Sequence, residues 1–111
     1  MVIKDEIANQ ATYFISLCEN HHVKYLYAFG SSTTDAFDKN KSDIDLLIEI
    51  DENDPLIKGE SLISLWDNFE EFFHRKVDLL TYSSIKNPIL KKNIEATKVL
   101  LYDGKRGQIF I

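Results

Sequence analysis

Two small groups of polar residues, each next to an apolar run, have the types and spacing that phosphate chemistry requires. Asp43 and Asp45 lie at the start of the run 44–50, and alternate residues of a strand share a face, so we expect the two carboxylates to stand together. Neighbouring carboxylates repel unless a cation lies between them, and Mg²⁺ prefers oxygen ligands. Gly30 and Ser31 end an earlier apolar run, where a glycine lets the backbone approach a phosphate. Together these residues predict phosphoryl or nucleotidyl transfer.

A third acidic residue, Asp78, lies inside the apolar run 77–82. A charge within such a run needs a partner, because burying an unpaired charge costs free energy. One explanation is a salt bridge to a cation such as Arg75, and the other is a position beside Asp43 and Asp45 around a metal ion. We favour the metal site, because the first two acids already predict one.

The motifs Gly30-Ser31, Ser42-Asp43-Ile44-Asp45-Leu46 and Val77-Asp78-Leu79-Leu80 resemble those of the minimal nucleotidyltransferases of the DNA polymerase beta superfamily. The resemblance covers nearly the whole chain, because those proteins are of about this size. It implies that Asp43, Asp45 and Asp78 are catalytic and bind two Mg²⁺ ions, with ATP as the substrate. It further implies that Asp78 binds the ion nearest the acceptor hydroxyl, and that Gly30, Ser31 and Ser42 bind the nucleotide.

The chain departs from the family pattern directly after the glycine–serine turn. Many members continue this turn with an arginine, a small residue and a glycine, whereas this chain continues with Ser32-Thr33-Thr34-Asp35. A triphosphate would therefore lack one expected cation. Lys39 or Lys41 could replace the arginine, and the competing interpretation is that both are solvated loop lysines.

Bacterial members of this family often act as antitoxins beside a small helical toxin with a HEPN domain. The resemblance implies transfer of AMP from ATP to a tyrosine of that partner, which silences its RNase. One competing hypothesis is a catalytically weak or inactive antitoxin that acts by direct binding to its toxin. Another is a receiver-like phosphoacceptor with an acidic Mg²⁺ pocket, which would require a five-stranded parallel sheet.

The composition limits the class of protein further. The chain has 111 residues and a net charge of −5, which suits one globular domain over residues 1–111 and gives no basic footprint for direct nucleic-acid binding. Its single cysteine, Cys18, cannot form an internal disulfide, and no run is apolar enough for a signal peptide or a membrane span. We therefore expect a cytoplasmic protein, as a homo-oligomer or hetero-oligomer if it assembles.

The hydrophobic pattern predicts alternating helices and strands. Helices are expected over residues 5–19, 31–37, 56–73 and from the Asn87-Pro88 pair onward; strands are expected over 23–29, 44–50, 77–82 and, as a short edge strand, 98–102. Alternation alone would suggest a parallel α/β sheet. The resemblance implies instead an α+β fold, a small mixed sheet with helices mainly on one face. The apolar tail 108–111 is expected to pack on the domain or on a partner.

Overall fold

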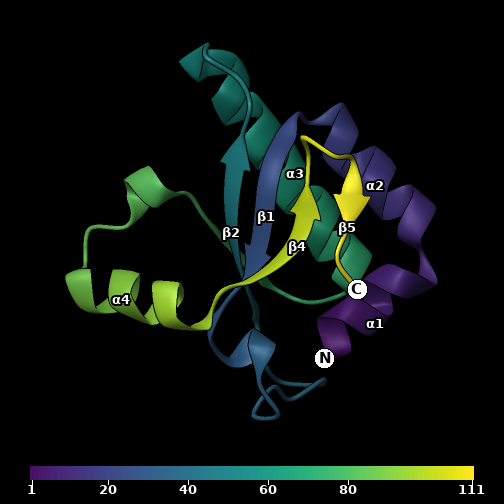
Figure 1. Ribbon diagram of the computed structural model, residues 1–111, viewed down its shortest axis with the longest axis vertical. Helices are drawn as coiled ribbons and strands as arrows, with labels where there is room; N and C mark the ends of the chain where they lie inside the picture. The colour runs from purple at the N-terminus through teal and green to yellow at the C-terminus, as the bar shows by residue number, and fades with distance from the viewer.

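A five-stranded sheet lies at the centre of the computed structural model, which describes residues 1–111 (Figure 1). Its strands are β1 (Val23–Ala28), β2 (Ile44–Ile50), β3 (Val77–Leu80), β4 (Val99–Asp103) and β5 (Gln108–Ile109). They lie in the order β3-β2-β1-β4-β5; β2 and β3 are parallel, and the other neighbours are antiparallel. The predicted mixed sheet is confirmed, and the parallel sheet of a receiver-like protein is excluded.

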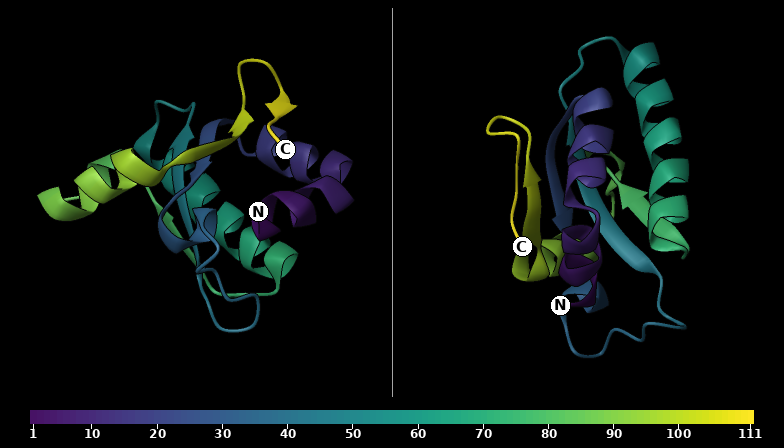
Figure 2. Two further views of the ribbon diagram at one scale, coloured as in Figure 1. Left: turned by 60° about the horizontal axis from the view of Figure 1, so that its bottom comes forward. Right: turned by 90° about the vertical axis from the view of Figure 1, so that its right-hand side faces the viewer.

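Helices cover mainly one face of this sheet, as predicted. The helices on that face are α1 (Val2–Asn9), α2 (Ala11–Asn20) and α3 (Pro55–Phe73), and one core of 21 buried residues joins them to the strands. Cys18 of α2 is fully buried in this core, which raises the pKa of its thiol. α4 (Pro88–Thr97) lies apart from the other three helices (Figure 1, Figure 2). None of these helices combines the length and the apolarity needed to span a membrane.

Local chemistry explains where the elements begin and end. Four alternate residues of β2 are buried against the helices, namely Ile44, Leu46, Ile48 and Ile50. The Asp54 side chain accepts a hydrogen bond from the N–H of Leu56 at the start of α3, and α3 ends at His74, whose φ is +52°. Asn87 caps α4 in the same way, with Pro88 at the first helical position, as predicted.

The helix predicted over residues 5–19 is two helices, because the chain turns at Gln10, where φ is −137° and ψ is 45°. Ile7 and Phe14 are both buried and lie seven residues apart, a spacing that one continuous helix would also place on one face, so the hydrophobic pattern gave no sign of this turn. The turn lets α1 and α2 each bury their own apolar side.

Three smaller differences concern segments near the ends of elements. The helix predicted over 31–37 is a single 3₁₀ turn, η1 (Gly30–Thr33), and the strand predicted over 77–82 ends at Leu80, before a second such turn, η2 (Tyr82–Ser84). The strand predicted at 98–102 is not an edge strand. The apolar tail pairs with it as β5 and becomes the edge, so the tail packs on the domain.

Candidate active site

Asp45 of β2 and Asp78 of β3 lie beside each other on neighbouring parallel strands. The register pairs Asp45 with Asp78 and Ile44 with Val77, and neighbouring strands lie about 4.8 Å apart. Because Ile44 and Val77 are buried against the helices, the two acids face the opposite side of the sheet. Asp45 is half-buried there and Asp78 is exposed. The structure thus brings these two predicted site residues together.

Asp43 lies one residue before β2 and is exposed. Its charge still acts on the same site. Burial, followed by the negative charges of Asp78 and Asp43, raises the pKa of Asp45 from its ordinary value of 3.8 to about 6. The three acids therefore form one region of mutual repulsion, centred on Asp45.

The three carboxylates do not form a preformed metal cage. No group of three or more histidine, cysteine, aspartate or glutamate side chains lies close enough together to hold a metal ion. The expected convergence of Asp43 with Asp45 and Asp78 is thus not present in this arrangement, since uncompensated carboxylates repel and Asp43 is not held by the strand register. Even so, the donor set fits a hard divalent cation: it consists of carboxylate oxygens, and a cation between them would relieve the repulsion that raises the pKa of Asp45.

Asp78 is exposed, so the prediction that it is a buried charge in need of a partner is wrong. The side chain is not buried, so no desolvation cost demands a partner. Arg75, the alternative partner, donates two hydrogen bonds to Glu6, with nitrogen–oxygen distances of 2.6 Å and 2.8 Å. Arg75 therefore joins β3 to α1, and the Asp78 carboxylate remains on the open face beside Asp45.

The glycine–serine turn lies directly against Asp45. Gly30 has a φ of +62°, and a β-carbon built on it would lie 3.3 Å from Asp45 Oδ2. The backbone N–H of Asp45 donates to Ser32 Oγ at 3.0 Å, while the N–H of Gly30 donates to Thr97 Oγ1 at 2.9 Å. A left-handed residue followed by a helical turn directs successive N–H groups to one side, which is a backbone arrangement that binds anions.

One cavity of about 530 Å³ contains these features together. The polar residues that line it are Gly30, Ser31, Thr34, Asp45, Asp78, Asn93 and Thr97. Leu80 and Leu90 are among the apolar residues of its wall. The cavity thus combines two carboxylates, the glycine–serine turn and an apolar surface.

Asn93 and Thr97 of α4 are cavity residues that the sequence did not indicate. They are four residues apart, so they share one side of the helix, and both line the cavity with Leu90. Asparagine and threonine are common in helices, so their types gave no signal. Only the position of α4, set by contacts distant in sequence, places them beside Gly30.

Ser42, Lys39 and Lys41 lie in the loop that precedes β2, and none of them lines the cavity. Ser42 Oγ accepts a hydrogen bond from the N–H of Asp38 at 2.8 Å, which closes this loop on itself. Lys39 and Lys41 are exposed. The role predicted for Ser42 in nucleotide binding stays a prediction, and the cavity contains no lysine in place of the missing arginine.

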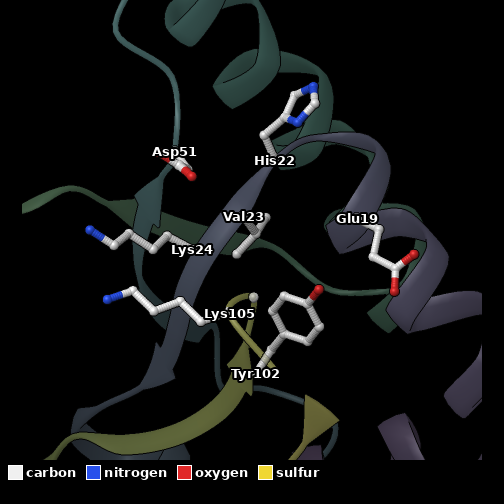
Figure 3. A pocket seen from close by; sticks show the side chains of 8 residues that line it. Glu19, His22, Val23, Lys24, Asp51, Tyr102 and Lys105 are labelled. Atoms are coloured by element: carbon white, nitrogen blue, oxygen red, sulfur yellow. The ribbon is translucent and has the colours of Figure 1, made fainter. Parts of the chain in front are cut away.

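A second, smaller cavity of about 220 Å³ lies at the opposite end of β1 and β2 (Figure 3). Val23, Asp51 and Tyr102 are among its lining residues. Figure 3 shows Lys24 and Lys105 extending in the same direction from its wall. Because it combines charges of both signs and lies far from the paired acids along the strands, it does not belong to the candidate active site.

Comparison with known proteins agrees with this geometry. The family model described as "Polymerase beta, Nucleotidyltransferase" matches residues 14–107. Two proteins of Methanocaldococcus jannaschii, each named "Putative protein adenylyltransferase", are 42% and 39% identical to this chain over 79 residues. These matches cover 71% of this chain and 76% and 77% of the two relatives.

Two solved structures share the fold. One is described as a toxin-antitoxin with AMP-PNP, with a TM-score of 0.60 and 18% identity over 86% of this chain and 78% of the other. The second is described as a "putative minimal nucleotidyltransferase", with a TM-score of 0.59 and 21% identity over 86% of this chain and 93% of the other. At these identities the likeness concerns the arrangement of the elements.

Proposed function

The chain belongs to the polymerase beta nucleotidyltransferase family, and we propose that it is an adenylyltransferase that moves AMP from ATP to a protein hydroxyl in a Mg²⁺-dependent reaction. One observation carries this proposal. Asp45 and Asp78, paired on adjacent strands, line the same cavity as the Gly30–Ser31 turn. Carboxylates beside a phosphate-binding turn are what nucleotidyl transfer requires.

The residues at this site would have separate roles in binding ATP, binding Mg²⁺ and accepting a proton. The N–H of Ser31, which lines the cavity, would bind the outer phosphates of ATP. Asp45, Asp78 and, after a small movement, Asp43 would bind Mg²⁺, which supplies positive charge for the phosphate oxygens. The acceptor oxygen would form a bond to the α-phosphorus as the bond to pyrophosphate breaks. Asp78, which is exposed, would accept the proton of the acceptor hydroxyl.

We further propose that the acceptor is a tyrosine of a helical HEPN-type toxin, so that the chain is the antitoxin of a toxin–antitoxin pair. The names of the M. jannaschii relatives support a protein as the acceptor. The fold neighbour described as a toxin-antitoxin with AMP-PNP supports a toxin as the partner and ATP as the nucleotide. The net charge of −5 favours a protein rather than a nucleic acid.

A second candidate is an antitoxin that neutralises its toxin by contact alone. The observation in its favour is the weak set of cations at the site: the turn has no arginine, and neither Lys39 nor Lys41 lines the cavity. A triphosphate bound there would depend more strongly on Mg²⁺ and on backbone N–H groups than in relatives that have the arginine.

Intact mass spectrometry separates the two candidates. The partner is first identified by co-purification with the tagged chain, and the purified pair is then incubated with ATP and Mg²⁺. We expect the wild-type protein to add one or more AMP masses to the partner, and the Asp43→Asn/Asp45→Asn double variant to add none. Asp67→Asn, an exposed change on α3, is the matched control and should transfer normally. No mass change with wild type, together with full neutralisation by the double variant, would favour the contact-only antitoxin.

A further inference from the structure

We propose that Thr97, at the end of α4, is the positioning residue that orients the Gly30–Ser31 turn for ATP. The proposal rests on the adenylyltransferase function proposed above, because it assigns the phosphates of ATP to that turn. Thr97 is 67 residues away from Gly30 in the sequence, and its Oγ1 accepts the Gly30 N–H at 2.9 Å in a partly buried position.

The hydroxyl of Thr97 is itself fixed in direction. It donates its proton to the carbonyl oxygen of Asn93, one turn earlier in α4, at 2.8 Å. A hydroxyl has one proton to donate and two lone pairs to accept with. Because the proton is directed into the helix, the lone pairs are left for Gly30. The bond to Gly30 is thus set by the helix rather than by a freely rotating side chain.

This bond assigns different roles to the N–H groups of the turn. The N–H of Gly30 is occupied by Thr97, so it is not available to a phosphate. The N–H of Ser31 follows it at the start of η1, where a helical turn leaves it without a partner inside the turn. We infer that Gly30 shapes the turn and that Ser31, which is exposed and lines the cavity, contacts the phosphate.

The turn is held from both sides. Ser32 Oγ accepts the N–H of Asp45 and ties the turn to β2, while Thr97 ties it to α4. Few other contacts hold α4 against the rest of the domain, because Ile94 is the only buried residue of this helix. Loss of the Thr97 hydroxyl should therefore release Gly30 and move the α4 wall of the cavity, with β2 and its acids left in place.

Three variants test this role. Thr97→Val keeps the shape of the side chain and removes the acceptor, and Thr97→Ser restores the hydroxyl. Thr33→Val is the matched control, because Thr33 Oγ1 donates to the carbonyl of Gly30 at 2.8 Å and does not touch its N–H. Two quantities are measured for each: the Kd for ATP with Mg²⁺ by calorimetry, and the hydrogen-exchange rate of the Gly30 amide by NMR.

We expect the Kd for ATP to rise about tenfold in Thr97→Val, as for the loss of one hydrogen bond, and the Gly30 amide to exchange faster. Thr97→Ser should restore both values, and Thr33→Val should leave the Gly30 amide protected. Equal loss of ATP affinity in Thr33→Val and Thr97→Val would overturn the proposal, because the general stability of the turn would then explain both. Unchanged Gly30 exchange in Thr97→Val would also overturn it. Failure of the wild-type protein to bind ATP would instead contradict the proposed function, while the exchange measurement still tests the Thr97 bond.

Discussion

Asp45→Asn should make the protein more stable at neutral pH while it abolishes transfer. The pKa of Asp45 is raised from 3.8 to about 6 in the folded protein, so between about pH 4 and pH 6 the folded chain binds more protons at this site than the unfolded chain does. Stability is therefore lost as the pH rises through this window, and the full cost is present at pH 7. Asparagine has nearly the same shape and carries no charge, so it removes that cost.

The size of the effect follows from the pKa and from the exposure of the side chain. A rise of roughly two pKa units corresponds to at most about 3 kcal/mol. Asp45 is only half-buried, so water reduces both the cost of burial and the repulsion by Asp78 and Asp43, and we discount the gain for Asp45→Asn at pH 7 to about 1 kcal/mol. Since no hydrogen bond to the Asp45 carboxylate is present to be lost, this gain should appear undiminished.

Urea unfolding at pH 7 and pH 4 measures this difference in the free energy of unfolding. The gain should be present at pH 7 and absent at pH 4, where the folded wild type already holds its proton at Asp45. Added Mg²⁺ should stabilise the wild type and not Asp45→Asn, because only the wild type keeps the carboxylate ligand. Asp67→Asn on the exposed side of α3 is the control and should match the wild type. A free energy of unfolding of Asp45→Asn at or below that of the wild type at pH 7 would refute the reasoning.

Three further predictions concern single contacts, and urea unfolding measures each. Gly30→Ala should cost about 1–2 kcal/mol and weaken ATP binding in a calorimetric titration, because φ is +62° and the new β-carbon would lie 3.3 Å from Asp45 Oδ2; unchanged affinity would contradict it. Gly59→Ala should instead stabilise α3 by about 0.5–1 kcal/mol, since nothing lies within 4 Å of its β-carbon. Arg75→Lys should cost about 1 kcal/mol, because lysine cannot reproduce the two parallel bonds to Glu6; a neutral result would show that this pair is fully screened.

The sequence predicted the parts of the site that depend on local periodicity. The alternation in β2 placed Ile44 and Asp45 on opposite faces, and the structure has them so. It also predicted the start of α4 at Pro88, because a capping asparagine followed by proline is a local signal. These features depend only on neighbouring residues, so a short stretch of sequence is enough to predict them.

The features that the sequence did not predict depend on contacts between distant segments. Gly30 and Thr97 are 67 residues apart, and Arg75 and Glu6 are 69 apart, so neither pair leaves a pattern in any short window. The mixed sheet, in which β1 is antiparallel to β2 and β4, likewise required the resemblance to a family, since alternation alone favoured a fully parallel sheet. The sequence also predicted that Asp78 would be buried, because its strand is apolar, whereas the side chain is exposed. The burial of each face of this strand depends on the position of α4, which is distant in the sequence.

The face of β2 that packs against the helices is opposite the face that carries Asp45. Ile44, Leu46 and Ile48 of β2 are each no more than 1% exposed, and burial of such side chains contributes about 1.5–3 kcal/mol apiece. The cost of the ionised Asp45 carboxylate, which comes from burial and then from repulsion, is about 1 kcal/mol after screening and is small beside that sum. The fold can therefore hold an unfavourable carboxylate at the centre of β2. A charge held in place by a well-packed strand cannot relax away from its neighbours, so a bound cation has the most repulsion to relieve here, beside the Gly30 turn.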